Sequence, residues 1–176
     1  TTPVGIIQFS KIVHPDITSG YTLDDNARAL IALVLHYKLT RDKADLPYLG
    51  IYLNFIKHCQ SSNGSFSNYV DEHGAFTDQN NHTNLEDAKG RTFWALGLLI
   101  SEGDIVPSEM IFIAENIFNR AVVRIEDMHS TRAMAFALKG LYYYNLKKEQ
   151  VQHRLLIHIL AQRLVQMYKH EGESKW

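Results

Sequence analysis

The chain has little of several features that mark out whole classes of protein. Its 176 residues include one cysteine, Cys59, which excludes an internal disulfide and favours a reducing compartment. The 18 basic and 19 acidic residues nearly cancel, so charge gives no indication of nucleic acid or an anionic membrane as partner. No apolar run approaches the roughly 20 residues that span a bilayer, and the first residues lack the pattern of a secretion signal. We therefore expect a cytoplasmic domain, and since it does not begin with methionine, a fragment of a longer polypeptide.

Helical periodicity dominates the rest of the sequence. It predicts six helical segments, at residues 24–40, 42–60, 86–103, 107–127, 130–147 and 150–170. No stretch alternates apolar and polar residues for long enough to predict a sheet. We therefore predict an all-α fold, in which residues 1–22 form an N-terminal lead-in segment and residues 23–176 form three helical hairpins.

The odd and even segments differ in composition. The first, third and fifth are uncharged over residues 29–35, 92–101 and 133–138 and are rich in alanine and glycine, which is typical of helices buried on every side. The even segments are amphipathic and concentrate their apolar side chains on one face. This difference predicts an inner layer of odd helices and an outer layer of even helices, as in stacked helical hairpins.

The three inner helices begin in the same way. Their first residues read Leu23-Asp24-Asp25-Asn26-Ala27-Arg28, Leu85-Glu86-Asp87-Ala88-Lys89-Gly90-Arg91 and Met128-His129-Ser130-Thr131-Arg132. Each has an apolar residue, then side chains that cap the amides of a helix's first turn, then an arginine. The repetition predicts a repeated helix pair that brings three polar clusters to one end of the array. We expect the functional site at that end.

Three longer strings at these positions are distinctive. They are GYTLDDNARAL at residues 20–30, GSFSNY at 64–69 and DAKGRTFWALG at 87–97. They resemble the α/α-toroid domains of the six-hairpin glycosidase superfamily, especially Bacteroides-type proteins grouped with glycosyl hydrolases or joined to glycosyltransferases. The resemblance covers essentially the whole chain and implies an (α/α)6 barrel, carbohydrate-related activity and a site at the inner-helix ends.

Such toroids close with six hairpins, whereas this chain supplies three. The resemblance therefore implies half of an (α/α)6 barrel. An arc of this kind leaves apolar edges, and large exposed apolar patches mark interaction surfaces. We expect these edges to be covered by a second copy in a homodimer or by the missing C-terminal half of the toroid.

The resemblance makes the acidic residues at the inner-helix ends candidate catalytic groups. Glycoside hydrolysis uses two carboxylates, one that protonates the leaving oxygen and one that attacks or activates water. The candidates are Asp24, Asp25, Glu86 and Asp87, with Asp71 or Asp78 of the long connecting segment as a further carboxylate. The alternative is that the four at helix starts are caps favoured by the helix dipole.

Candidate substrate-binding residues accompany these carboxylates. Arg28, Arg91 and Arg132 stand early in otherwise apolar helices, where they either form ion pairs or bind a sugar or phosphate. Residues 61–84 form a long connection with five asparagines, and such loops often carry function. The other candidates are Tyr21, Phe66, Asn68, Tyr69, Trp94 and His129. Trp94 is alternatively a core residue, and His129 a structural hydrogen-bonding group.

These features predict a glycoside hydrolase that acts on an oligo- or polysaccharide. No cofactor or metal is expected, because the histidines lack the paired spacing of zinc ligands and there is no glycine-rich phosphate loop. Two alternatives stay open. One is a non-catalytic carbohydrate-binding or accessory module associated with a glycosyltransferase, and the other is a structural helical-repeat scaffold.

Overall fold

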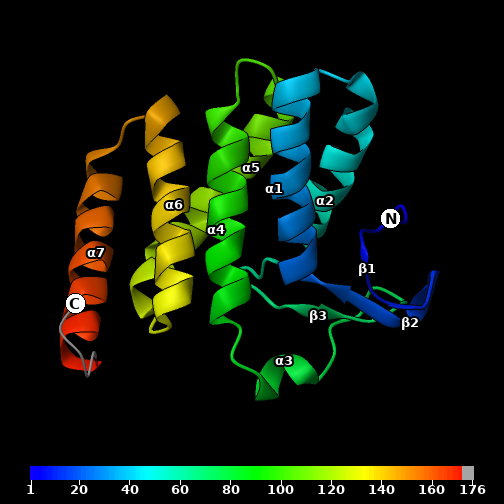
Figure 1. The fold of residues 1–176 in the computed structure, drawn as a ribbon, viewed down its shortest axis with the longest axis horizontal. Helices are drawn as coiled ribbons and strands as arrows, with labels where there is room; N and C mark the ends of the chain where they lie inside the picture. Colours follow the sequence, from blue (N-terminus) through cyan, green and yellow to red (C-terminus); the bar gives the residue numbers. More distant parts are fainter. Residues whose placement is uncertain (172–176) are drawn as a thin grey trace.

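A computed structural model describes residues 1–171 of the chain, which are mostly helical (Figure 1). The helices are α1 (Leu23–Thr40), α2 (Leu46–Cys59), α3 (Gln79–His82), α4 (Glu86–Ser101), α5 (Ser108–Ala121), α6 (Thr131–Lys147) and α7 (Val151–Glu171). Short 3-10 helices at Lys43–Asp45 and Val122–Asp127 precede α2 and follow α5. The six predicted helices are therefore confirmed, and α3 is an additional single turn inside the predicted connection. Within residues 1–171, no helix is both long and apolar enough to span a bilayer.

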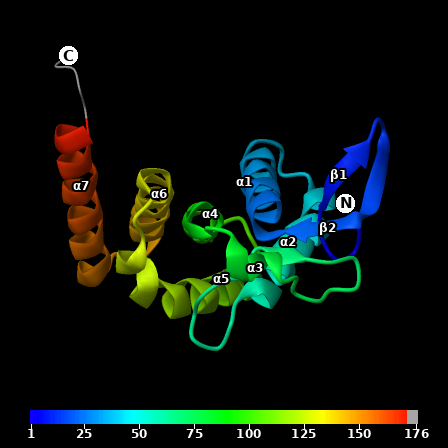
Figure 2. The same ribbon diagram turned by 90° about the horizontal axis from the view of Figure 1, so that it is seen from below.

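The helices are arranged in two layers. Helices α1, α4 and α6, called the inner helices below, lie side by side, and all three begin at the same end of the molecule (Figure 1). Seen along their axes, α2 and α5 form a second row and α7 lies beside α6 (Figure 2). The predicted layering is confirmed for the inner helices and for α2 and α5, whereas α7, which was predicted to lie in the outer layer, lies beside α6 instead.

The all-α prediction is wrong for the residues before α1. Strands β1 (Ile7–Lys11) and β2 (His14–Thr22) form an antiparallel hairpin, and β3 (Tyr69–Val70) pairs with the end of β2. Most side chains of β1 and the first part of β2 are exposed, so the pairing depends on backbone hydrogen bonds and produces no alternating apolar pattern. The lead-in segment is thus a strand hairpin that joins the start of α1 to the long connection.

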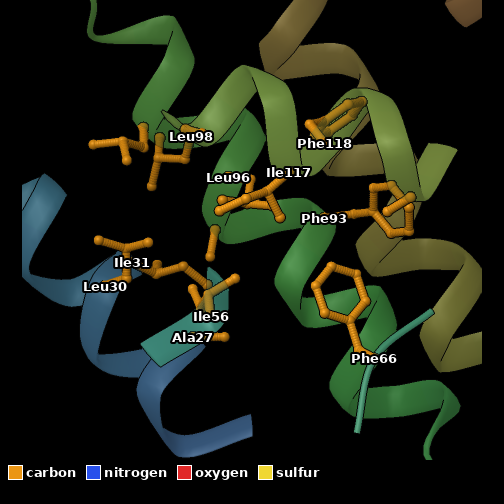
Figure 3. Packing of buried hydrophobic residues seen from close by; sticks show 14 of the residues in the cluster. Ala27, Leu30, Ile31, Ile56, Phe66, Phe93, Leu96, Leu98, Ile117 and Phe118 are labelled. Carbon is orange, nitrogen blue, oxygen red and sulfur yellow. The ribbon is translucent and has the colours of Figure 1, made fainter. Parts of the chain in front are cut away.

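A single apolar core lies between the two layers. Figure 3 shows residues from α1, α2, α4 and α5 that meet there, including Leu30, Ile56, Leu96 and Ile117, all of which are buried. The outer helices α2 and α5 present one apolar face to this core, as their amphipathic sequences predict. Burial against the inner helices therefore holds the outer layer in place.

Helices α4 and α6 make the most extensive helix contact of the fold, and glycines allow it. A Cβ atom on Gly90 would lie 2.7 Å from the Cα of Ala133, and one on Gly97 would lie 2.8 Å from the Cα of Gly140. A Cβ on Gly140 would in turn overlap the backbone of Phe93. The glycines of the inner helices therefore serve close backbone packing.

Candidate functional site

The N-termini of α1, α4 and α6 meet at one end of the molecule, next to the β-sheet and α3 (Figure 1). The predicted gathering of three polar helix starts is therefore confirmed. At the start of α1, Thr22 donates a 2.6 Å hydrogen bond from its hydroxyl to Asp25 Oδ2, and the same hydroxyl accepts from the Asp25 amide at 3.2 Å. Asp25 is thus part of a reciprocal helix cap, which is the structural alternative considered for it.

An alternating row of acids and arginines joins the three helix starts, and we call it the arginine ladder. Arg91 of α4 pairs with Asp24 of α1, and Arg132 of α6 pairs with Asp87 of α4. Arg28 forms a local pair with Asp24 at 2.8 Å. Each inter-helix pair joins the arginine of one hairpin to the aspartate of the preceding hairpin, so the ladder is a structural link between repeats.

The two ladder pairs differ in burial. Arg91 is only 9% exposed, whereas the Arg132 side chain is 70% exposed. Burial lowers the pKa of the Arg91 guanidinium, although Asp24 favours its charged form. Asp87 raises the pKa of Arg132 through its hydrogen bond and charge. The structural interpretation of these arginines as ion-pair partners is therefore confirmed, with Arg91 paired to the preceding helix rather than to its own.

The acids of α4 also cap α6. Glu86 Oε2 accepts hydrogen bonds from the amides of His129 at 2.8 Å and Ser130 at 2.5 Å. Asp87 Oδ1 accepts from the Ser130 hydroxyl at 3.0 Å. His129 contributes its amide to this contact, and its side chain is exposed. These bonds satisfy free amides at the start of α6 and fix it against α4.

The acids of the connecting segment stabilise turns. Asp71 Oδ1 accepts from the amides of Ala75 at 2.8 Å and His73 at 2.9 Å, and these backbone hydrogen bonds lower the Asp71 pKa. Asp78 is exposed and pairs with His82 of α3 at 3.0 Å. Among residues 1–171, neither acid is hydrogen-bonded or ion-paired to the arginine ladder, so the structure does not bring them into that cluster.

Four other predicted residues make local contacts in the N-terminal segment and in the connection, and two of them contact α1 or α4. The Tyr21 hydroxyl is 3.0 Å from Thr2 Oγ1 and its ring is buried. Buried Asn68 accepts from the Asp24 amide at 3.0 Å, and Tyr69 donates its amide to Asn80 Oδ1 at 2.9 Å. Phe66 is also buried and packs beside α4 (Figure 3). Their main contribution is therefore to local structure.

A stack of four side chains fills the seam between α4 and α6. The Arg91 guanidinium lies 4.6 Å from the centre of the Phe136 ring, which stacks on Trp94 with ring centres 5.7 Å apart. Lys139 Nζ lies 3.2 Å from the centre of the Trp94 ring, and burial lowers the pKa of this ammonium. The Trp94 ring is partly buried against the core and already contacts a cation and an aromatic ring, which favours the core alternative, and substrate binding by Trp94 stays a prediction.

An open hollow lies beside this stack, and we call it the inner-face hollow. Its volume is about 410 Å³, and Arg28, Arg91, Trp94 and Phe136 contribute to its lining together with apolar side chains of α1. Three predicted substrate-binding residues therefore share one concave surface. Asp24 forms ion pairs with both arginines of this surface.

Sequence reasoning missed Phe136, Lys139 and Lys89. The spacing of Phe136 and Lys139 on α6 equals that of Arg91 and Trp94 on α4, three residues in each case. That matched spacing could have predicted interleaved side chains on neighbouring inner helices. Lys89 stands two residues before Arg91, and the other two inner helices have an uncharged residue at the equivalent position. Lys89 also lines a second pocket.

Within residues 1–171, no three His, Cys, Asp or Glu side chains gather closely enough to hold a metal ion. No family model matches the chain, and no match was found among curated proteins. The contacts described above are therefore the basis for assigning a function.

Proposed function

We propose that this chain is a saccharide-binding domain whose three hairpins form half of an (α/α)6 toroid. The inner-face hollow is the observation that supports this proposal best. It combines two arginines, whose planar groups can donate several hydrogen bonds to hydroxyls, with the aromatic side chains of Trp94 and Phe136. Its volume of about 410 Å³ lies within the ~300–1,000 Å³ typical of small-molecule sites.

The candidate acids already have hydrogen-bond or ion-pair partners, and this favours saccharide binding over hydrolysis. A glycosidase needs one carboxyl group that holds a proton and a second that is free to attack or to activate water. Asp24 and Asp87 hold arginines, Asp25 and Glu86 cap helices, and Asp71 accepts backbone amides. We therefore propose an accessory module of a carbohydrate-active enzyme, such as a glycosyltransferase, rather than a hydrolase.

We also propose that exposed apolar side chains of α7, at the end of the row of helices, are buried by contact with another part of an assembly. Leu155, Val165 and Tyr168 are exposed there, each with more than half of its surface accessible. Exposed apolar side chains on one helix favour burial in an assembly. We propose that a second copy or further hairpins cover them, and sedimentation velocity of the purified chain tests the first possibility.

Calorimetric titration against a panel of oligosaccharides tests the binding function. Arg28→Ala should weaken binding of the saccharide that binds best by at least about tenfold, because a hydrogen bond to a charged group contributes ~1.5–3 kcal/mol. Arg28 is exposed and pairs only within its own helix among the described residues, so the fold should survive. Arg154→Ala is the matched control, because Arg154 is an exposed arginine of α7 with a local partner, Glu149.

Two outcomes would contradict the proposal. One is an absence of saturable binding to any saccharide, and the other is equal binding by the Arg28 and Arg154 variants. Release of reducing ends by the wild-type chain, lost in Asp24→Asn, would establish hydrolysis instead.

A further inference from the structure

A second cavity lies at the same end of the molecule, between the inner and outer layers. We call it the rim pocket; its volume is about 160 Å³. Phe66 and Phe93 form apolar walls, and the two rings lie near each other along α4 (Figure 3). Four charged residues also line it: Glu86 and Lys89 from α4, and Arg124 and Asp127 from the 3-10 helix after α5. The pocket is distinct from the inner-face hollow, with which it shares no lining residue.

Three of the four charged groups of the rim pocket already have partners. Glu86 Oε2 accepts two backbone amides, and Arg124 Nη2 pairs with Asp127 Oδ2 at 3.2 Å. The Lys89 amide donates to the Leu85 carbonyl at 3.0 Å, whereas its side-chain ammonium forms no hydrogen bond or ion pair with any residue between 1 and 171. One positive charge in the pocket is therefore left without a direct partner.

Lys89 is also partly removed from water. Burial lowers the pKa of its ammonium, with a smaller contribution from Arg124, while Glu86 and Asp127 act in the opposite direction. A partly desolvated ammonium without a partner is unfavourable, and a bound anion would remove this penalty. The pocket thus places a partly desolvated ammonium, which has no direct side-chain partner, beside two aromatic walls.

We propose that the rim pocket binds a small monocarboxylate with an apolar body. The carboxylate pairs with Lys89, and the apolar body lies against Phe66 and Phe93. A single negative charge matches the single unpartnered cation, whereas a phosphate dianion would also meet the carboxylates of Glu86 and Asp127. The volume of about 160 Å³ is below the ~300 Å³ of sites for drug-sized ligands, so the ligand has one ring or a short chain.

Benzoate is the probe for this site. Its binding is monitored by the changes that it causes in the amide chemical shifts of the full chain. Saturable shifts are expected at residues 64–66, and Lys89→Met should weaken benzoate binding by at least about tenfold, the loss of one charge-assisted hydrogen bond. Methionine keeps the length and apolar character of the lysine stem, so this variant should fold. Lys139→Met is the matched control, because burial also lowers the pKa of that lysine but it lies in the stack between α4 and α6.

Benzamide and glucuronate separate the two parts of the proposal. Benzamide keeps the ring without the charge, and glucuronate keeps the charge on a hydroxylated body, so both should bind more weakly than benzoate. Equal binding of benzoate and benzamide, equal affinity of Lys89→Met and the wild type, or an absence of saturable shifts would overturn the proposal. Equal binding of glucuronate would overturn the assignment of an apolar body.

A pH series gives a second measurement that does not depend on a variant. Benzoate stays ionised across the neutral and alkaline range, so its affinity should fall as Lys89 loses its proton. Because the Lys89 pKa is lowered, that fall should begin at a lower pH than for an ordinary lysine. A constant affinity up to the range where ordinary lysines titrate would contradict the role of Lys89.

Discussion

Gly97→Ala tests whether close backbone contact holds α4 against α6. A Cβ atom at this position would lie 2.8 Å from the Cα of Gly140 and closer still to its carbonyl oxygen. Carbon atoms prefer separations of about 3.5–4.0 Å, so the two helices would have to separate by roughly 1 Å. Both sides of the contact are backbone, which cannot rotate away, and the cost should reach the upper part of the ~1–3 kcal/mol typical of overpacking.

The helix propensity of alanine offsets part of this cost. Alanine is better than glycine inside a helix by about 1 kcal/mol, so the net loss of stability should be about 2 kcal/mol. For a chain of this length, that loss lowers Tm by roughly 4–8 °C. Urea and thermal unfolding followed by circular dichroism measure both quantities.

Gly50→Ala is the control for helix propensity. Gly50 lies in α2, where a Cβ atom would meet the Met110 side chain at 3.6 Å, an ordinary contact. This variant should therefore be more stable than the wild type by up to about 1 kcal/mol. The packing argument is refuted if Gly97→Ala is as stable as the wild type or gains stability as Gly50→Ala does.

Two further predictions concern buried groups. Asp24→Asn removes the charge that pairs with Arg91 and should lower the free energy of unfolding by about 2 kcal/mol, less than the ~3–5 kcal/mol of a fully buried pair because Asp24 is partly exposed. Asp87→Asn, whose partner Arg132 is exposed, should have a smaller effect in the same urea titration, and an equal loss would contradict the role of burial. Burial raises the pKa of the Cys59 thiol, so this thiol should stay protonated and react with a disulfide reagent only as fast as the chain unfolds. Rapid labelling of the native protein at mildly alkaline pH would contradict its burial.

The sequence was sufficient to predict the helices, because their patterns are local. Periodicity placed the six long helices, and the repeated starts at Asp24 and Asp87 placed their acidic ends together. The sheet could not be predicted in this way, since β1 is held by backbone pairing and buries no alternating face. The partner of Arg91 also depends on the register between neighbouring helices, which the spacing within α4 does not determine.

The candidate functional residues also differ in how far the sequence alone could predict their roles. Residues that cap a helix, such as Asp25, act within their own turn, so the sequence already offered capping as an alternative to a catalytic role for Asp25. The stack of Arg91 and Phe136 and the isolation of Lys89 depend on which helix lies alongside and how closely. The glycines of α4 and α6 set that distance, and their role as contacts becomes visible only when both helices are in place.

The arginine ladder also gives the row of hairpins a direction. Each inter-helix ion pair of the ladder joins an aspartate to the arginine of the next hairpin. Arg28, at the α1 end of the row, therefore has no inter-helix pair of this kind with a preceding described hairpin. At the α6 end, the position four residues before Arg132 is Met128, which is buried and uncharged. If two arcs closed head to tail, Arg28 of one copy would meet Met128 of the other. The electrostatic links would then be confined to the interior of each arc, and a ring of two copies would open first at its two junctions.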